Sequence, residues 1–505
     1  MSRAVTTASA VVLLGAASFT SAFGSEARDA KTVTADPLAT WQTDGVVWSV
    51  EYARGVVYVG GAFDSVRPPG AEPGEREVAR KNFAAFDAAT GRLLPCAHSF
   101  TGSDEGVRAL KASRDGKVLY VGGSFDRVDG GKAADAVALD TDGCALRKDF
   151  RPAMGGTVRA IDTTDSEVYL GGDFKAVDGR TRSRIASFTR SGALLPFKAD
   201  IDLPVRAVVA APEYGKVIVG GDFHHVNGEP EQALIALDPK TGSTVTSFPD
   251  WLPSRSVVKS LARDATGFYL GAEGSGTGVF DGRIAGRLSD GKMIWKDVCQ
   301  GATQSVIVYD GILYSGSHAH YCAVTPGGFP DGPRRHLLAQ SVRDSRILHW
   351  FPNTNEGIGE KVGPRALVMA GGILWAGGEF TKVNGKPQQG LTRFGTGGRG
   401  SAPEAAPRLA AKSQGAGKVT LTWRAAWDRD DAELTYRIYR DGALVTSIRK
   451  KSAEWDRPDM TYTDSVTPGS RHSYTITVSD GENTSPKSPA AEVTALATKR
   501  SAGEH

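Results

Sequence analysis

Short β-type runs that end in glycine recur seven times between residues 56 and 380. Their first glycines follow one another at intervals of 45 to 62 residues, and four copies continue with Val-Asp-Gly or Val-Asn-Gly. The copies are VVYVGGAF (56–63), VLYVGGSF (118–125), EVYLGGDF (167–174), KVIVGGDF (216–223), GFYLGAEG (267–274), ILYSGSHA (312–319) and ILWAGGEF (373–380). A repeat of this length with several short strands buries its faces only against its neighbours, so we predict stacked repeat units.

Each repeat contains four β-runs. In the third repeat they are TVRAID (157–162), VYLGGDF (168–174), SRIASF (183–188) and ALLPF (193–197). The intervening Asp178-Gly179 and Ser191-Gly192 are typical of hairpin turns. Four short antiparallel strands repeated seven times, without a predicted helix, describe the blades of a β-propeller. We therefore predict an all-β chain in which residues 36–397 form a seven-bladed β-propeller.

The last repeat is incomplete. After LTRF (391–394) the chain continues into glycines instead of a fourth β-run. Residues 38–41, LATW, match the fourth runs of other repeats, such as LLPF (194–197). We predict that 38–41 supplies the missing strand of the seventh blade. Closing the ring in this way removes exposed strand edges, which otherwise favour aggregation.

The C-terminal part has a different pattern. Residues 398–407 have the composition of a linker, and residues 408–496 alternate apolar and polar positions over the length of one β-sandwich. This segment resembles a fibronectin type III domain. The matching residues are Trp423, Tyr436, Tyr439, Tyr474, Val478 and the turn at 481–486. Residues 497–505 are predicted to be a tail, and we interpret Asp428–Asp431 as a solvated loop rather than an ion site.

A G-G-x-F repeat propeller joined to a fibronectin type III module resembles certain secreted bacterial proteins. The resemblance implies the fold more firmly than it implies a reaction. Such modules often accompany polysaccharide-degrading domains, and the resemblance therefore implies a polysaccharide as one class of ligand.

The N-terminus is typical of an export signal. Arg3 precedes an apolar stretch, Ala10–Phe19, that is too short to span a bilayer, and small residues follow it. We predict a signal peptide over residues 1–27, with an uncleaved membrane anchor as the alternative. No later segment is apolar enough to cross a membrane. We expect a monomer that is secreted or associated with the cell surface.

Four cysteines are an even number in an apparently exported chain, which favours two disulfides. Three pairings are possible. We favour Cys96–Cys144 and Cys299–Cys322, because each of these pairs links consecutive repeats. No C-x-x-C spacing indicates a zinc site.

Composition excludes several function classes. The formal net charge is +3 over 505 residues, which does not indicate a nucleic-acid surface. The glycine-rich stretches lie among β-runs, where they indicate turns, and no nucleophile elbow opens a helix. We therefore expect no cofactor.

Aligning the repeats reveals paired charges on their first two strands. Arg159 and Asp173 are fourteen residues apart across a hairpin, and the pairs Lys259–Glu273 and Arg365–Glu379 have the same separation. Arg206 and Asp222 are sixteen apart. An even separation places both side chains on one face of the sheet. Gln304 is expected to face His318 and Trp48 to face Ala62, whereas Arg108 has only the weak partner Ser124.

These positions lie where first strands start and second strands end, at one end of the predicted channel. We call this end the rim. The pairs are interpreted either as internal ion pairs that satisfy partly buried charges or as a ligand site, since propellers usually bind ligands at this end. The ligand-binding candidates are Arg206, Asp222, Lys259, Glu273, Gln304, His318, His320, Arg334, Arg335, Arg365 and Glu379.

Repeats five and six depart from the consensus and are the better functional clue. They lose the phenylalanine and the Val-Asx-Gly turn, and carry His318, His320 and the run Arg334-Arg335-His336. Degeneration of the repeat is the alternative explanation. His318, His320 and Glu273 could together offer ligand atoms to a metal ion. His-x-His alone is a weak signal, however, and we expect no metal site.

We predict a non-catalytic binding or adhesion protein whose ligand is a carbohydrate or an extracellular protein. One alternative is a glycosidase or polysaccharide lyase that uses Asp222, Glu273 or Glu379 as a carboxylate pair. Basic partners would suit these groups to act as a base or nucleophile rather than as an acid. The other alternative is a structural component of the cell surface.

Overall fold

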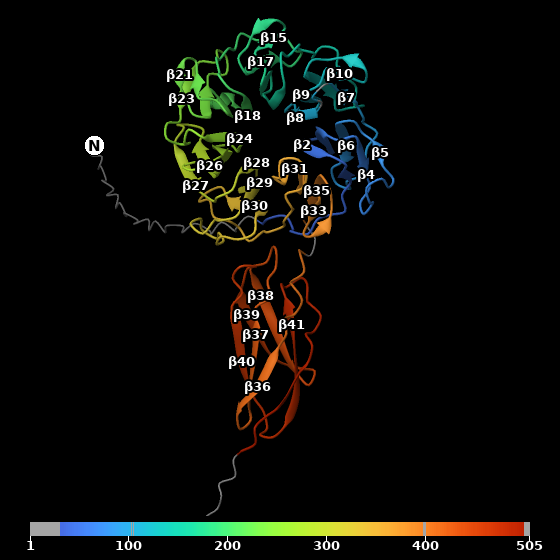
Figure 1. Ribbon diagram of the computed structural model, residues 1–505, viewed down its shortest axis with the longest axis vertical. Helices are drawn as coiled ribbons and strands as arrows, with labels where there is room; N and C mark the ends of the chain where they lie inside the picture. Colours follow the sequence, from blue (N-terminus) through green and yellow to red (C-terminus); the bar gives the residue numbers. More distant parts are fainter. Residues whose placement is uncertain (1–30, 103, 105, 397–399, 499–505) are drawn as a thin grey trace, which may run out of the picture. The chain divides into compact units, whose positions relative to one another are not determined.

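The computed structural model describes residues 31–102, 104, 106–396 and 400–498. The predicted signal peptide, the start of the linker at 397–399 and the end of the tail at 499–505 lie outside the described residues. Within them the regular elements are β-strands and one short 3-10 turn, η1 (Pro212–Tyr214). Seven of the described sheets follow one another around a ring (Figure 1). We number these sheets as blades one to seven in chain order.

Each blade starts with its innermost strand, and the chain then proceeds outward through antiparallel neighbours. The innermost strands are β2 (Val46–Ala53), β8 (Gly106–Ala112), β13 (Val158–Thr163), β18 (Val205–Ala211), β24 (Ser256–Arg263), β28 (Thr303–Tyr309) and β31 (Pro364–Ala370). The second strands are β3 (Val56–Ala62), β9 (Val118–Ser124), β14 (Glu167–Gly172), β19 (Lys216–Gly221), β25 (Gly267–Gly274), β29 (Ile312–Ala319) and β32 (Ile373–Gly378). The third strands are β6 (Phe83–Asp87), β12 (Ala136–Asp140), β17 (Ile185–Thr189), β22 (Leu234–Leu237), β26 (Gly282–Arg287), β30 (Arg335–Ser341) and β35 (Leu391–Phe394).

The predicted fourth strand is full only in blades four and five, as β23 (Thr244–Ser247) and β27 (Met293–Asp297). In blades one, two, three and six it shrinks to a single bridge, such as Phe188 with Leu194. The prediction of four strands in every repeat was therefore wrong. In blade three the run continues into Pro196, which has no N–H to donate to a ladder.

The ring closes between blade seven and blade one. Each innermost strand packs against the next, and β31 packs against β2. The N-terminal segment also lies beside the last blade: Leu38 N donates to Arg393 O at 2.8 Å, and Pro37 bridges Phe394. Residues 38–41 lie where a closing strand was predicted, but the pairing is limited to this short contact, and β1 (Gln42–Thr43) instead pairs with β4 (Ser65–Arg67).

The first glycine of each repeat is required by the neighbouring blade. A Cβ added at Gly171 would lie 2.5 Å from Cγ1 of Val205 on β18, and one added at Gly377 would lie 2.3 Å from Cγ1 of Val47. The missing side chain therefore leaves the space that the first-strand valine of the next blade fills. The second contact joins blade seven to blade one, so this packing also closes the ring.

In blades one to four and blade seven the second residue of the pair is also a glycine, which fits closely against its own blade, whereas blades five and six have Ala272 and Ser317 there. A Cβ at Gly172 would lie 2.1 Å from the carbonyl oxygen of Thr157, because β13 bulges towards it. The register between β13 and β14 shifts between Val158 and Ala160, and this shift leaves Arg159 without a paired residue on β14. All seven blades have this shift at the corresponding residue. A bulge of this kind redirects the side chain of the extra residue.

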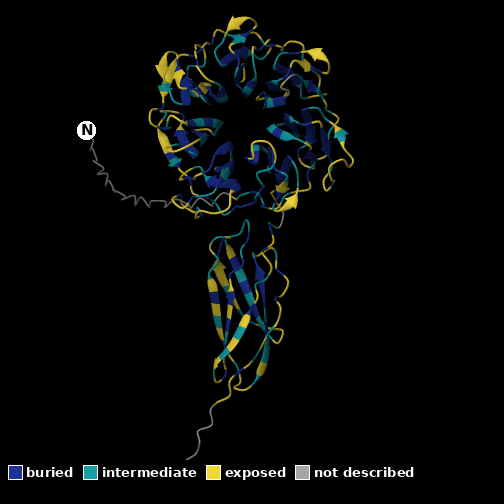
Figure 2. Cartoon of the chain, viewed as in Figure 1, coloured by how far each residue is buried: buried dark blue, intermediate teal, exposed yellow. Residues whose placement is uncertain are grey.

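The four Val-Asx-Gly turns form small hairpins at the periphery: β10 (Arg127–Val128) with β11 (Gly131–Lys132), β15 (Ala176–Val177) with β16 (Arg180–Thr181), β20 (His225–Val226) with β21 (Glu229–Pro230), and β33 (Lys382–Val383) with β34 (Lys386–Pro387). Their Asx residues have φ of 48° to 52° and are followed by glycines with positive φ, as the predicted hairpin turns require. Three short strands complete the edge of the first two blades: β4, β5 (Val78–Ala79) and β7 (Phe100–Thr101). These peripheral turns are exposed, whereas the blade interiors are buried (Figure 2).

Residues 410–494 form two sheets that share one core. The first contains β36 (Ala410–Gly415), β37 (Lys418–Arg424) and β40 (Asp459–Ser465), and the second contains β38 (Glu433–Arg440), β39 (Ala443–Lys451), β41 (Arg471–Ser479) and β42 (Ala491–Thr494). Trp423, Tyr436 and Tyr474 are buried together in that core. Three of the aromatic residues on which the resemblance was based thus lie in the core that the two sheets share, whereas Tyr439 is half-buried beneath Lys487.

Both favoured disulfides are present, Cys96–Cys144 and Cys299–Cys322. The first joins blade one to blade two, and the second joins the segments on either side of the first two strands of blade six. Each bond therefore ties loops of the repeat region together.

An ion pair between Arg283 and Asp297 is buried where the other blades have apolar residues. Both side chains are 0% exposed, and Arg283 Nη2 lies 2.8 Å from Asp297 Oδ2. Asp297 also accepts from Gln340 and Thr325. Burial opposes the charged form, but Arg283 and these hydrogen bonds hold the pKa of Asp297 below its ordinary value. The pair thereby links blade five to blade six.

Replacing Gly171 by Ala is expected to lower the free energy of unfolding by about 1–3 kcal/mol, because the new Cβ would overlap Val205. Urea unfolding measures the change. Gly332→Ala is the control, since the nearest atom to its added Cβ is 3.9 Å away. Combining Gly171→Ala with Val205→Ala should cost less than the sum of the two single changes. Strict additivity would contradict the proposed role of the first glycine.

Arg283→Met is expected to destabilise the protein by about 3–5 kcal/mol, because it leaves Asp297 charged and buried without its counter-ion. Arg159→Met should cost less than about 1 kcal/mol, because that pair is partly exposed. Chemical denaturation of both variants tests the difference. Equal losses would show that the buried pair is not the stronger structural link.

Candidate functional site

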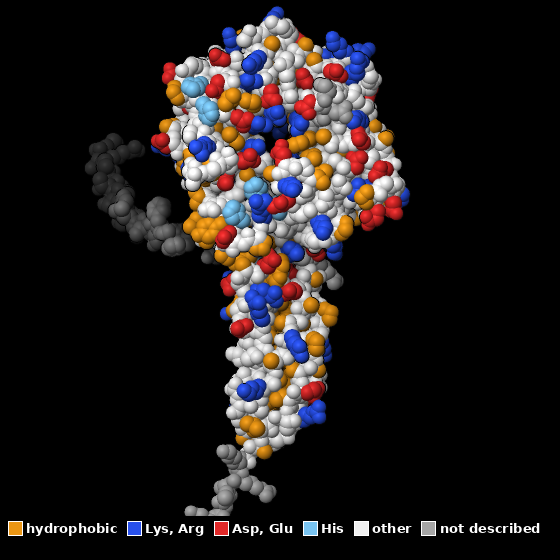
Figure 3. All heavy atoms as spheres, viewed as in Figure 1, with side chains coloured by type: hydrophobic (Ala, Val, Ile, Leu, Met, Phe, Trp, Pro, Cys, Tyr) orange, Lys and Arg blue, Asp and Glu red, His pale blue; other side chains and the backbone are white. Residues whose placement is uncertain are grey.

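Seven bulged residues define the rim: Trp48, Arg108, Arg159, Arg206, Lys259, Gln304 and Arg365. Each lies near the start of the innermost strand of its blade, so equivalent side chains come from equivalent places around the ring. The ring is hollowed at its centre, where basic and acidic side chains gather around the opening (Figure 3). The bulge therefore arranges the rim residues as a set.

The four predicted charge pairs are present. Arg159 lies 2.6 Å from Asp173, Arg206 lies 2.6 Å from Asp222, and Lys259 lies 3.5 Å from Glu273. Arg365 lies 3.1 Å from Glu379. The first two pairs are joined by two or more hydrogen bonds each. Their side chains remain 21–28% exposed, so they stay accessible at the rim.

Blade two lacks such a pair. No ion pair joins Arg108 to a carboxylate among the described residues, and its Nε is buried without a hydrogen-bond partner. The guanidinium instead covers one face of Trp48, with Cζ 4.2 Å from the ring centroid. Arg365 covers Trp48 at 4.3 Å as well. Burial, and then the like charge of Arg159, lower the pKa of Arg108.

The expected contact between Gln304 and His318 is wrong. Gln304 donates to Glu273 of blade five at 2.5 Å, so it bridges two blades instead of facing its own. His318 keeps a buried Nδ1 without a partner among the described residues. Burial, together with Arg334 and His336, lowers the pKa of His318. The histidine is therefore neutral at physiological pH.

Glu379 serves as a loop anchor. Its side chain is 1% exposed and accepts from the backbone N–H groups of Glu360 and Val362, both at 2.8 Å. Arg365 binds both Glu360 and Glu379. A carboxylate so enclosed cannot contact a ligand while this loop keeps its conformation.

The run Arg334-Arg335-His336 does not converge on one site. Arg334 pairs with Glu356, whereas Arg335 is buried, pairs with Glu454 and covers the ring of Trp455. His336 is buried and hydrogen-bonds Asn353. Alternation along the chain places Arg335 on the opposite face from Arg334 and His336, both of which lie near His318. The run thus stabilises three different contacts.

His320 lines a pocket of about 600 Å³ beside blades five and six. Asp281, Gln300 and Tyr321 also line it. Burial, and then the nearby charge of Glu273, raise the pKa of Asp281, whose carboxylate accepts from Gly274 N at 2.6 Å. The sequence analysis missed Asp281, because it lies in a loop that has no counterpart in the other repeats.

The other end of the channel contains a cavity of about 750 Å³ that the sequence analysis also missed. Lys111 lies 3.5 Å from Asp162 there, and both Asp162 and Glu51 raise its pKa. Burial in turn raises the pKa of Glu51. Each of these residues stands three positions after the bulged residue of its blade, and this shared position is the signal that could have identified them.

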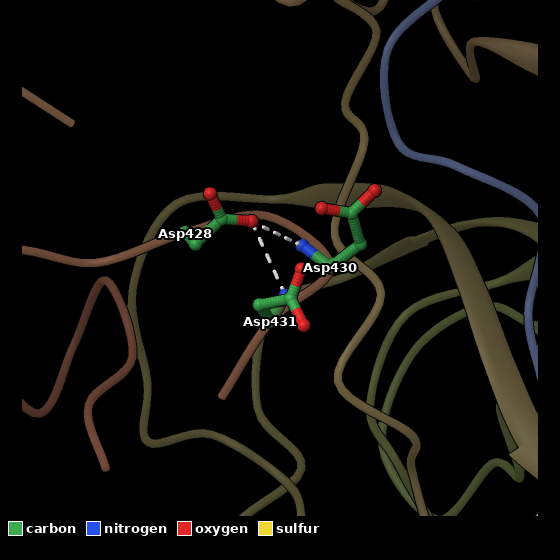
Figure 4. Close-up of side chains that lie close together, drawn as sticks. All are labelled: Asp428, Asp430 and Asp431. Atoms are coloured by element: carbon green, nitrogen blue, oxygen red, sulfur yellow. Dashed lines mark hydrogen bonds between the residues drawn. The ribbon is translucent and has the colours of Figure 1, made fainter. Parts of the chain in front are cut away.

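Glu273, His318 and His320 do not form a metal-binding group. Within the described part of the chain, the group of three potential ligands close enough to hold an ion is Asp428, Asp430 and Asp431 (Figure 4). Asp428 is 2% exposed and accepts from the backbone N–H groups of the other two, so the solvated loop predicted here was wrong. Burial and Asp430 raise the pKa of Asp428 to about 8, so a proton neutralises this carboxyl at neutral pH.

The Asp428 cluster has a structural role in the chain. Asp430 accepts from Ala35 N at 2.8 Å and from Ser401 Oγ at 2.7 Å. The carboxylate therefore connects the segment that precedes blade one with the start of the C-terminal segment. Among the described residues, no helix has the length and apolar character that a membrane span needs.

Comparisons with known proteins support the propeller architecture. Residues 215–248 match the family model described as a domain of unknown function (DUF5122) beta-propeller. The match covers the second, third and fourth strands of blade four. No curated protein matches the chain.

Several solved structures are similar in fold to the chain. A chain of the mitotic checkpoint complex is 15% identical, with 75% of this chain and 99% of that chain covered and a TM-score of 0.44. Sqt1 of Saccharomyces cerevisiae is 11% identical, with 72% and 99% covered and a TM-score of 0.42. KlAtg21, in complex with the coiled coil of AgAtg16, is 10% identical, with 68% and 98% covered and a TM-score of 0.32. The chain is thus an all-β protein that contains a β-propeller with two disulfides.

Proposed function

We propose that this is a secreted, non-catalytic binding protein in which a seven-bladed propeller presents a ligand site at its rim. In this proposal residues 408–496 are a fibronectin type III module that acts as a spacer or second binder. The ligand is an extracellular protein or a carbohydrate. Disulfides and the export-type N-terminus support an extracellular location.

One observation carries the proposal. At the rim, Arg159, Arg206 and their carboxylate partners are held in place by paired hydrogen bonds while remaining partly exposed. Polar groups fixed in this way before binding lose little conformational freedom when a ligand arrives. Each carboxylate would have to leave its cation before it took part in proton transfer, which favours recognition over catalysis.

Arrays of extracellular proteins and of glycans, probed with the purified chain, test the rim as a binding site. We expect the double variant Arg206→Ala/Asp222→Ala to lose at least about tenfold in affinity for each hit, because it removes a fixed pair without changing the net charge. The control is the double variant Arg287→Ala/Asp290→Ala, which removes a more exposed ion pair and also leaves the net charge of the protein unchanged. Unchanged binding by the rim variant would rule out this site.

A glycosidase or lyase is the second candidate, because Asp281 combines a raised pKa with a place in the 600 Å³ pocket beside His320. A protonated carboxylic acid is what a general acid requires.

Chromatography of any bound polysaccharide after incubation separates the two functions. Under the binding proposal we expect its chain length to remain unchanged. Cleavage by the wild-type chain that Asp281→Asn abolishes, while Asp264→Asn in the same blade preserves it, would establish the enzyme instead.

A further inference from the structure

Blade two presents a cation at the place where blades three, four, five and seven hold a complete ion pair. Arg108 occupies the bulge position of Arg159 and Arg206, and the acidic residue that should follow is Ser124. Arg108 and Ser124 are sixteen residues apart, the same separation as Arg206 and Asp222. The blade therefore keeps the geometry of the pair and lacks only its carboxylate.

The guanidinium of Arg108 is nonetheless held in position. It lies against Trp48 with Cζ 4.2 Å from the ring centroid, and Arg365 lies over the ring at 4.3 Å. Stacking on an aromatic face stabilises a cation and orients its plane. The position of Arg108 thus does not depend on a carboxylate of its own blade.

Arg108 also has unmet hydrogen-bonding capacity. Its Nε is buried and has no hydrogen-bond partner among the described residues. The nearby charges of Arg159 and Arg365 add to the cost of burying this cation, and those of Asp104 and Glu360 offset part of it without forming an ion pair with Arg108. A carboxylate from a ligand would give Nε a hydrogen-bond acceptor and would give the guanidinium a counter-ion in direct contact.

We propose that an acidic side chain of a protein partner completes blade two by placing its carboxylate between Arg108 and Ser124. The inference rests on the proposed function and specifies its ligand chemistry. The carboxylate would take the place that Asp173 and Asp222 occupy in their own blades. It would accept two N–H bonds from Arg108, the geometry in which guanidinium and carboxylate pair best.

Two observations favour a protein side chain over an acidic sugar. Blades three, four, five and seven fill this place with Asp or Glu, which carry the carboxylate on a short flexible stem, whereas a uronic acid carries it directly on a bulky ring. Trp48, the aromatic residue beside the site, has Arg108 and Arg365 over its ring. A sugar would therefore have to displace a cation before it stacked on this tryptophan.

Ser124→Asp in the full chain tests the proposal, because it supplies the missing carboxylate internally. The probe is a fluorescein-labelled Gly-Glu-Gly-Glu-Gly peptide with blocked ends, followed by fluorescence polarisation. We expect Ser124→Asp and Arg108→Gln each to weaken binding by at least about tenfold, because a hydrogen-bonded charge pair is lost. Ser124→Asp should leave the melting temperature unchanged or higher, since it adds an ion pair. Arg180→Gln, which removes an exposed charge at the ring's periphery, should bind like the wild type.

Several outcomes would overturn the proposal. They are equal binding of the glutamate peptide and its glutamine analogue, undiminished binding by Ser124→Asp, or an equal loss in Arg180→Gln, which would indicate general electrostatic attraction. Stronger binding of oligogalacturonate than of the peptide, also lost in Ser124→Asp, would replace the protein partner by an acidic sugar. Array hits that bind wild type and Ser124→Asp alike, but not Arg206→Ala/Asp222→Ala, would refute this inference and leave the proposed function standing.

Discussion

Small residues at the two glycine positions of each repeat are the constraint on which both the ring and its rim depend. At Gly171 the absent side chain admits Val205 of the next blade, and at Gly172 it admits the bulging backbone of its own first strand. One contact acts between blades and the other within a blade. The first sets how closely neighbouring sheets pack. The second leaves room for the bulge, which directs one side chain per blade towards the rim and is also present opposite Ala272 and Ser317 in blades five and six.

Much of the fold could be predicted because these contacts leave a periodic trace in the sequence. The charge pairs could be predicted too, since Arg159 and Asp173 belong to adjacent strands of one hairpin. Contacts between polar side chains of different blades left no such trace. The bridge from Gln304 to Glu273 and the stack of Arg108 on Trp48 join residues whose proximity depends on the curvature of the ring. Comparing equivalent positions within repeats could not reveal them.

Blades five and six depart from the repeat consensus, and part of this departure has a structural explanation. Arg283 and Asp297 replace apolar packing, and Gln340 of blade six completes their hydrogen bonds. Thr325, in the loop tied by Cys299–Cys322, contacts Asp297 as well. A buried pair that depends on both blades favours one specific arrangement of neighbours. Loss of the consensus here is therefore weaker evidence for ligand binding than the sequence alone indicated.

Charge inside the channel also has a structural reason. The innermost strands are sheet edges, and unpaired backbone N–H groups on an edge need acceptors. Glu51 accepts from Ala112 N of the next blade, and Asp162 accepts from Ala210 N. Polar side chains there connect neighbouring blades and need no ligand to account for them. The strongest argument for recognition is consequently a residue that such contacts leave unsatisfied. Trp48, His318 and Arg365 also have a buried nitrogen without a partner among the described residues, but Arg108 is the described rim cation that has no carboxylate in ion-pair contact.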